Sequence, residues 1–272
     1  MTQLSKAVVL LTGATGGFGQ ELAQQLLVLG SHLILTDLDQ ATLEQQVATL
    51  GQTRSPGKIL THFTADLSSS EGCDRLHSHV QQFCQSHDIS IDVLINNAGI
   101  AVFGRMDEVP QDQWETLMQI NLLSPMRLSA LFAAEMIARQ RGHIVNISSI
   151  AGWVSPPGLA HYSASKFGLR GFSEGLFSEV GPYNVQVTAV YPYFSRTPIL
   201  RSPRYGTLAK SGTHFSESDA TDPAAVMRQT IRAIQQNQLH TFPDWTAKMI
   251  QVMKRLFPKL SIWVLQVLTK RK

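Results

Sequence analysis

Short runs of consecutive apolar residues alternate along this chain with longer segments whose apolar residues recur every three or four positions. The apolar runs lie at 7–12, 32–37, 58–66, 91–99, 142–149 and 184–192. The segments of helical periodicity lie at 17–30, 38–50, 69–87, 112–140 and 162–181. Continuous rather than alternating apolar runs are typical of a parallel sheet that is covered on both faces. The pattern predicts a single α/β domain, built as a doubly wound parallel sheet that binds ligands at the carboxyl ends of its strands.

Two segments depart from this alternation. Residues 193–222 show no clear period and contain many turn residues, and a loop of this length in a compact domain is usually functional. Residues 244–272 combine apolar residues at helical spacing with basic residues. Neither part of this tail reaches the roughly 20 uninterrupted apolar residues that span a bilayer. Two interpretations stay open: a helix in an anionic membrane interface, or a helix packed on the body or on a partner subunit.

Charge is distributed unevenly between the tail and the rest of the chain. The 272 residues carry a net charge of +3, but 245–272 hold seven Lys/Arg and no Asp/Glu. The remainder therefore has 16 basic and 20 acidic residues, a net charge of −4. Because the basic excess belongs to the tail, the body is not expected to bind nucleic acid.

The two cysteines, Cys73 and Cys84, lie eleven residues apart in one predicted helix, where a disulfide has poor geometry. With His77 and His87 they share a helical face, but one face cannot close a tetrahedral metal site alone. We interpret the cysteines as small buried residues in a reducing compartment and expect no metal.

Glycines cluster directly after the first predicted strand. The stretch TGATGGFG runs from Thr12 to Gly19 and opens the first predicted helix. Gly13, Gly17 and Gly19 permit a tight turn, close backbone approach to a pyrophosphate, and helix–strand packing. The helix N-terminus offers free N–H groups to the phosphates. This strand, loop and helix predict a Rossmann-type dinucleotide-binding domain.

Asp37 ends the second predicted strand, eighteen residues after Gly19. A carboxylate there can accept hydrogen bonds from both ribose hydroxyls of the adenosine half and would repel a 2′-phosphate. No Lys or Arg lies in the glycine loop or directly after Asp37 to offset this charge. Asp39 is better placed to cap the next helix, which leaves Asp37 for the ribose. NAD is therefore favoured over NADP.

Four motifs resemble those of the classical short-chain dehydrogenase/reductase family. They are TGATGGFG at 12–19, NNAG at 96–99, ISS at 147–149 and YSASK at 162–166. The resemblance covers about residues 5–235, and the four motifs in this order and at these separations are specific. It implies an oxidoreductase that uses a nicotinamide cofactor to interconvert an alcohol with a ketone or an aldehyde.

The resemblance assigns catalytic roles to four polar residues. Tyr162 is the acid–base residue. Lys166, one helical turn later, lowers the pKa of the phenol together with the positive nicotinamide, and it holds the nicotinamide ribose. Ser149, thirteen residues before Tyr162, donates a hydrogen bond to the substrate oxygen. Asn121 anchors a water beside Lys166, and its place before Pro125 in the long predicted helix fits a local kink. His161 does not match a catalytic position.

The resemblance also implies a set of cofactor contacts. They comprise Gly13, Thr15, Gly17, Phe18, Gly19, Asp37, Leu38, Asp66, Leu67, Asn97, Ala98, Gly99, Tyr162, Lys166, Pro192 and Thr197. Within this set, 97–99 lie under the adenine ribose, Asp66 and Leu67 contact adenine, and Thr197 binds the carboxamide. Asn96 is more suited to tying strands together.

One position departs from the family pattern. In YPYFSRT at 191–197, Tyr193 stands where the family usually has glycine. Its ring must turn outward or form a wall of the substrate pocket beside Ser149 and Tyr162.

These expectations divide the chain into an NAD-binding catalytic domain at 1–243, with a substrate loop at 193–222, and a basic amphipathic helical tail at 244–272. The expected substrate is an apolar alcohol or carbonyl compound. An alternative is a catalytically weak NAD-sensing or scaffold protein on the same fold, which the intact Ser149, Tyr162 and Lys166 disfavour. An epimerase or dehydratase is also disfavoured, because such relatives are longer and have a separate substrate domain.

The resemblance implies a homodimer or homotetramer, formed through the long helix near 112–140 and the helix of Tyr162. We expect a cytoplasmic protein, peripheral on the inner membrane face if the tail binds lipid.

Overall fold

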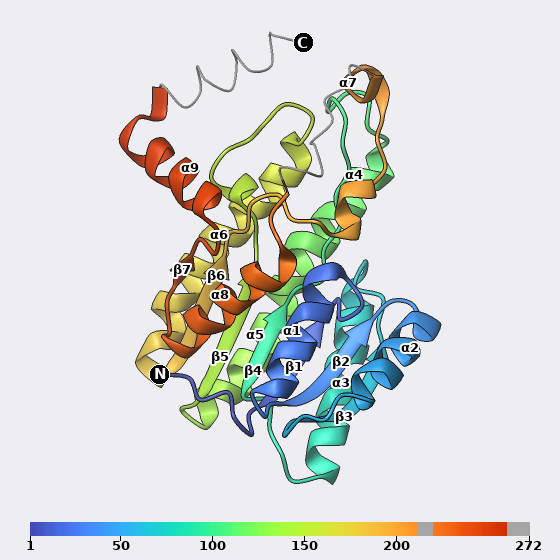
Figure 1. Ribbon diagram of the computed structural model, residues 1–272, viewed down its shortest axis with the longest axis vertical. Coiled ribbons are helices and arrows are strands. Elements are labelled where there is room, and N and C mark those ends of the chain that lie inside the picture. Colours follow the sequence, from blue (N-terminus) through green and yellow to red (C-terminus); the bar gives the residue numbers. More distant parts are fainter. Residues whose placement is uncertain (211–219, 260–272) are drawn as a thin grey trace.

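The computed structural model describes residues 1–210 and 220–259 of the chain, and strands and helices alternate along it (Figure 1). The strands are β1 (Val8–Thr12), β2 (His32–Asp37), β3 (Lys58–Thr64), β4 (Val93–Asn96), β5 (Gly142–Ile147), β6 (Val185–Val190) and β7 (His240–Thr241). The α-helices are α1 (Gly17–Val28), α2 (Gln40–Gly51), α3 (Ser70–Ser86), α4 (Gln111–Met118), α5 (Ser124–Ala138), α6 (Ala160–Val180), α7 (Gly206–Lys210), α8 (Pro223–Gln235) and α9 (Trp245–Leu256). Shorter turns are the π-turn η1 (Gln119–Leu123) and the 3₁₀ turns η2 (Ile150–Gly152), η3 (Gly181–Tyr183) and η4 (Pro198–Arg201).

The strands form one parallel sheet in the order β3-β2-β1-β4-β5-β6-β7. Every residue of β1, β4 and β5 is buried, as the continuous apolar runs predicted. The order reverses between β1 and β4, which confirms the doubly wound fold and places a ligand crevice above these strands. The two-residue strand β7 was not predicted. It pairs with the end of β6 through Ala189 and Val190.

Helices cover both faces of the sheet and close a separate hydrophobic core on each. One core packs α1, α2 and α8 against the sheet through residues such as Leu22, Leu43 and Ile231. The other packs α3, α5 and α6 and includes Cys73 and Cys84, which are buried and not disulfide-bonded. Burial raises the pKa of the Cys84 thiol to about 11. Both cysteines therefore pack as small apolar residues, and among the described residues no group of His, Cys, Asp or Glu could hold a metal ion.

A buried chain of polar side chains ties β4 and β5 to the helices behind them. The amide of Asn96 donates hydrogen bonds to Ser129 Oγ at 3.0 Å and to Asn146 Oδ1 at 2.9 Å. Asn146 in turn donates to Ser173 Oγ at 2.9 Å, and Ser173 donates to the carbonyl of Leu169 at 2.7 Å. Buried hydrogen bonds of this kind rigidify a core. The expectation that Asn96 ties strands together is confirmed.

The segment predicted as one long helix at 112–140 consists of α4, the π-turn η1 and α5. Asn121 lies within the π-turn, and Pro125 is the second residue of α5. The irregularity therefore precedes the proline, which stands near the start of a helix where its missing N–H disrupts least. Single π-turns inside helices frequently mark functional sites.

The loop predicted at 193–222 contains η4 and α7. One single-pair parallel bridge attaches it to the body, from Arg204 to Phe103, and a second joins the two ends of the loop, Ser195 and Thr221. Its residues 211–219 lie outside the described residues. Within the described ranges, no helix is long and apolar enough to cross a membrane. Of the predicted tail, residues 260–272 also lie outside the description, and α9 accounts for most of the rest.

Candidate functional site

The glycine loop joins β1 to α1 at the carboxyl end of the sheet. Gly13 has φ +64°, a left-handed conformation that favours glycine, and a Cβ there would lie 2.7 Å from Ala98 Cα. A Cβ on Gly19 would lie 2.1 Å from the Gly13 carbonyl oxygen. Both positions therefore require glycine, and the close turn leaves the N-terminus of α1 facing the crevice.

Hydrogen bonds connect the glycine loop to the segment after β4. Thr12 Oγ1 accepts hydrogen bonds from the N–H groups of Asn97 and Ala98, both at 3.0 Å. The Asn97 amide donates back to the carbonyls of Thr12 at 3.0 Å and Gly13 at 2.9 Å. The structure thus brings the predicted residues 97–99 beside the glycine loop. Thr12 was missed as a site residue, although a hydroxyl at a strand end before a glycine turn was the available signal.

Asp37 lies at the end of β2 and is oriented by the glycine loop. Its Oδ2 accepts from the Thr15 N–H at 2.8 Å and the Thr15 hydroxyl at 2.7 Å, and its Oδ1 accepts from the Leu38 N–H at 2.8 Å. Asp39 instead caps α2 by accepting from the Thr42 N–H at 2.8 Å. The prediction that Asp39 caps α2 is confirmed. The role of Asp37 toward the ribose stays a prediction.

Two further predicted contacts converge on this region. Asp66 accepts from the Ser68 N–H at 2.8 Å, and the hydrogen bonds from Ser68 hold the pKa of that carboxyl below its usual range. A Cβ on Gly17 would lie 2.7 Å from Thr197 Cγ2, so Thr197 sits against the start of α1. The structure therefore brings Thr197, in the segment after β6, against the glycine loop. A contact between Thr197 and the carboxamide of a nicotinamide requires this proximity and stays a prediction.

The three expected catalytic side chains meet where β5 ends and α6 begins. Ser149, just after β5, hydrogen-bonds the Tyr162 hydroxyl and also accepts from the Ala151 N–H at 3.1 Å. Lys166 Nζ donates to the Ile147 carbonyl at 3.0 Å and lies 5.7 Å from the centroid of the Tyr162 ring. The 3.6-residue helical period places Tyr162 and Lys166 on the same face of α6.

Burial shifts the pKa values of Tyr162 and Lys166 in opposite directions. Burial raises the pKa of Tyr162 to about 12, although the hydrogen bond from Ser149 lowers it. Burial also lowers the pKa of Lys166 to about 8. Burial is thus the largest cause of both shifts, and the lowering of the phenol pKa by Lys166 together with the nicotinamide stays a prediction.

Asn121 is fully buried and held by the backbone that follows the NNAG motif. Its amide donates to the Ile100 carbonyl at 2.8 Å, and its Oδ1 accepts from the Ile100 N–H at 2.9 Å. A Cβ on Gly99 would lie 3.2 Å from Asn121 Oδ1 and 3.6 Å from Lys166 Nζ. The amide and the ammonium group thus flank Gly99, and the water link between them stays a prediction.

Tyr193 and His161 both have clear structural attachments. The Tyr193 N–H donates to Asp244 Oδ2 at 2.8 Å, and its half-buried ring packs at a tilt on Phe194 with centroids 6.1 Å apart. His161 is buried, and its Nε2–H donates to the Val102 carbonyl at 2.8 Å. His161 therefore supports the backbone after β4, whereas Tyr193 joins the substrate loop to the cap of α9.

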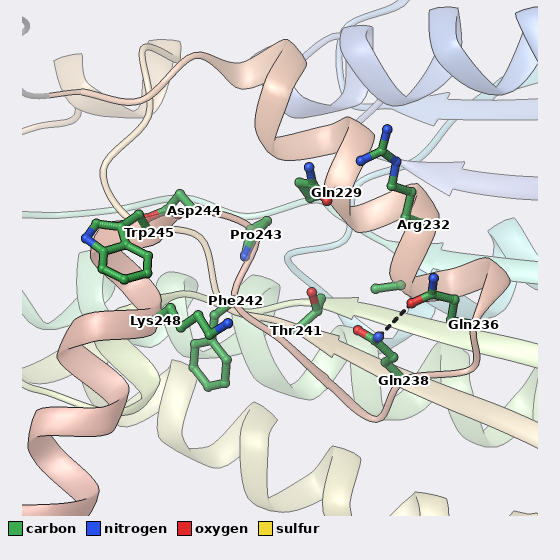
Figure 2. A pocket seen from close by; sticks show the side chains of 11 residues that line it. Gln229, Arg232, Gln236, Gln238, Thr241, Phe242, Pro243, Asp244, Trp245 and Lys248 are labelled. Atoms are coloured by element: carbon green, nitrogen blue, oxygen red, sulfur yellow. Dashed lines mark hydrogen bonds between the residues drawn. The ribbon is translucent and has the colours of Figure 1, made fainter.

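Two cavities of about 470 Å³ lie beside α9. Figure 2 shows the first, between α8 and α9, which is lined by Gln229, Arg232, Ala233, Gln236, Gln238, Thr241, Phe242, Pro243, Asp244, Trp245 and Lys248. The second is lined by Trp153, Arg170, His240, Phe242, Gln251 and Arg255. Neither is lined by a predicted catalytic or cofactor-binding residue.

The residues around the crevice fit a nicotinamide dinucleotide. Four of the eight residues of the glycine loop, Gly13, Gly16, Gly17 and Gly19, carry no side chain, so the backbone there can approach a pyrophosphate closely. The surrounding backbone leaves no room for a side chain at Gly13 or Gly19. Asp37 supplies a carboxylate at the ribose end. Tyr162 and Lys166 supply a phenol and an ammonium group at the reacting end.

Comparison with known proteins gives consistent results. The profile of the family described as short chain dehydrogenase matches residues 7–206. Epidermal retinol dehydrogenase 2 of Mus musculus is 32% identical over 255 residues, which cover 92% of this chain and 78% of that protein. A short-chain dehydrogenase from Sphingobium yanoikuyae in complex with NADPH has 26% identity and a TM-score of 0.75, over 88% of each chain. A short chain dehydrogenase/reductase from Burkholderia phymatum in complex with NAD shares the fold, with a TM-score of 0.83 over 96% of each chain and 22% identity.

The family profile covers well over half of the chain, and it spans the glycine loop, Asn121, Ser149, Tyr162 and Lys166. These are the residues that the fold brings to one edge of the sheet. The chain belongs to the short-chain dehydrogenase/reductase family of oxidoreductases.

Proposed function

We propose that this protein is an NAD(H)-dependent oxidoreductase that interconverts an alcohol with a ketone or aldehyde on an apolar substrate. The observation that carries the proposal is the grouping of Ser149, Tyr162 and Lys166 beside the glycine loop. When bound, the nicotinamide supplies the hydride chemistry. The protein supplies orientation and a path for the proton.

Tyr162 exchanges a proton with the substrate oxygen, and Ser149 holds that oxygen by a hydrogen bond. The phenol needs a lower pKa than the value of about 12 that burial gives it. A positive charge beside the phenol favours its ionised form, and Lys166 with the oxidised nicotinamide provides that charge. Lys166 also holds the nicotinamide ribose, and Asn121 positions a water that connects Lys166 to solvent.

The choice of NAD rests on Asp37. Its carboxylate faces the glycine loop, and neither Thr15 nor Leu38, the residues that bind it, brings a positive charge. A 2′-phosphate at this position would meet an uncompensated negative charge. The solved relatives include complexes with NADPH and with NAD, so the proposal depends on this chain's own carboxylate.

The apolar character of the substrate is supported by two observations. The Tyr193–Phe194 aromatic pair begins the substrate loop, directly after the segment that ends at Pro192. A relative that covers nearly the whole chain is named for retinol, a long apolar alcohol. Aromatic side chains present large apolar surfaces that suit such ligands.

The proposal is tested with purified protein, NAD and a panel of apolar alcohols, by following NADH formation in an absorbance assay. We expect turnover with at least one apolar secondary or primary alcohol, and much lower kcat/KM with short polar alcohols. A matched reaction with NADP and a reaction with Ser149→Ala protein serve as controls. NAD binding without turnover on any member of the panel would instead favour the NAD-sensing or scaffold alternative.

We also propose a homodimer or homotetramer built on the outer faces of α5 and α6. Leu123 at the end of η1, Met126 of α5 and Phe167 of α6 are exposed by 48%, 37% and 41%. A Cβ on Gly171 or Gly175 would meet nothing within 4 Å, so α6 can approach a partner closely. Apolar side chains around a flat glycine face are suited to helix–helix contact between subunits.

Phe167→Asp is therefore expected to shift the protein toward the monomer. Light scattering should give at least twice the 30.0 kDa chain mass for the wild type and a lower mass for the variant. Val28→Asp, at the exposed end of α1, is the matched control and should leave the mass unchanged. A wild-type mass of 30.0 kDa at micromolar concentration would contradict the proposal.

A further inference from the structure

The apolar face of α9 points away from the rest of the protein. Because successive residues of an α-helix are rotated by about 100°, Trp245, Met249, Val252 and Leu256 fall within roughly 60° of one another. Trp245 is 73% exposed and Leu256 is 62% exposed. Ala247, the buried residue of this helix, lies on the opposite side. A surface helix that packs on its own domain has the reverse arrangement, with its apolar stripe toward the core.

Two cavities of about 470 Å³ adjoin one flank of α9, next to the apolar stripe. Trp245 and Lys248 line one of them, and Gln251 and Arg255 line the other. Figure 1 shows α9 projecting from the body beside the carboxyl end of the sheet. Packing on the body therefore does not account for the four exposed apolar residues, Trp245, Met249, Val252 and Leu256.

Positive charges border the exposed apolar stripe. Lys248 and Arg255 lie along one margin of the stripe, at about 60° to 100° from its centre. Lys254 and Lys259 add two further cations. The sequence from 245 to 272 contains no Asp or Glu, and its last residues continue with apolar and basic types. An apolar face bordered by Lys and Arg is the composition of a helix that lies in a membrane interface.

We propose that α9 binds the surface of an anionic lipid bilayer, with Trp245, Met249, Val252 and Leu256 inserted among the lipid chains and the adjacent cations on the headgroups. The positive charge favours an anionic lipid surface over a second copy of the chain, because a second α9 would bring the same cations to the contact. Lipid phosphates and carboxylates complement these cations.

The attachment of α9 places this lipid surface next to the catalytic edge. Asp244 caps α9 by accepting from the Ala247 N–H at 2.7 Å, and it also accepts from the Tyr193 N–H at the start of the substrate loop. The helix contacts η2, which begins directly after Ser149. A bilayer held by α9 would therefore lie on the side from which an apolar substrate enters. This last step rests on the proposed function.

Vesicle flotation of the full-length protein tests the lipid proposal without using turnover. We expect the wild type to float with phosphatidylglycerol-containing vesicles at low salt and to remain unbound with pure phosphatidylcholine vesicles. Loss of one cation is expected to lower the partition coefficient about fivefold. Lys248→Glu/Arg255→Glu should therefore lower it by at least about 25-fold. Val252→Asp/Leu256→Asp should weaken it by about a hundredfold, because two inserted side chains become charged.

The controls change matched residues at other places on the surface. Lys58→Glu reverses an exposed charge at the start of β3, and Val28→Asp places a charge on another exposed apolar residue. Both should float like the wild type. Absence of wild-type flotation at low salt would overturn the proposal, and so would flotation of both α9 variants to the same extent as the wild type. So would a fall in oligomer mass of Val252→Asp/Leu256→Asp with unchanged flotation, since it would identify a second copy as the occupant of the apolar face.

Discussion

Replacing Tyr162 by phenylalanine is expected to lower kcat by about 10²- to 10⁴-fold, the usual contribution of a positioned acid–base group. The substitution keeps the ring in its packed position on α6 and removes the hydroxyl that hydrogen-bonds Ser149. The contacts proposed for the dinucleotide at the glycine loop and at Asp37 are untouched. NADH affinity should therefore change little while turnover is lost.

Steady-state kinetics and NADH fluorescence titration of the same preparation separate these two effects. Tyr183→Phe is a matched control, because it removes an exposed phenol hydroxyl after the far end of α6. The control should retain wild-type kcat. A Tyr162→Phe protein with near-wild-type turnover would show that another group handles the proton, whereas loss of NADH binding would show that the variant damages the cofactor site.

The wild type is expected to use NAD with a kcat/KM about 10²- to 10³-fold higher than with NADP. Two unit charges about 4 Å apart at an effective dielectric constant of 20 repel by about 4 kcal/mol, which corresponds to about a thousandfold. Asp37→Asn removes this charge but keeps an oxygen that can accept from the Thr15 N–H. The variant should gain kcat/KM with NADP and lose some with NAD, because the ribose hydroxyls lose a charged acceptor.

Parallel measurements of kcat/KM with both cofactors test this prediction on the wild type, Asp37→Asn and a control. Asp39→Asn is the control, since Asp39 is an exposed carboxylate two residues away that caps α2. It should keep the wild-type cofactor ratio. Equal kcat/KM values for the two cofactors in the wild type, or a preference for NADP, would refute the assignment of Asp37 to the ribose.

The fold was predictable where burial on both faces left a continuous apolar run, as in β1, β4 and β5. The edge strand β3 is only half-buried and was found from its place in the alternation of strands and helices. The glycine loop located the crevice. The seventh strand was not predicted, because His240 and Thr241 are only two residues and neither is strongly apolar. For the long helix, Asn121 before Pro125 indicated a local kink, and the π-turn at 119–123 lies there. The type of irregularity could not be predicted, because Ile120, Leu122 and Leu123 keep apolar residues in the stretch.

The site was predictable where the residue types themselves carry the chemistry. Ser149, Tyr162 and Lys166 meet as expected. The hydrogen bond between Thr12 and Asn97 connects residues 85 positions apart, so no local sequence pattern reveals it. The pKa of Tyr162 was also beyond local reasoning, because its direction depends on how deeply the tertiary structure buries the phenol.

The π-turn η1 changes the rotational phase between α4, which precedes it, and α5, which follows it. In an uninterrupted α-helix, Leu117 and Leu128 would point in nearly the same direction, since eleven residues make about three turns. The turn at 119–123 accommodates about one extra residue, a rotation of roughly 80° to 100°. Leu117 consequently packs with Val102 and Val109 beside the site, whereas Leu128 packs into the sheet core. α4 therefore packs beside the site and α5 packs on the sheet, although the two helices follow each other directly in the chain. Asn121 lies in the turn between them.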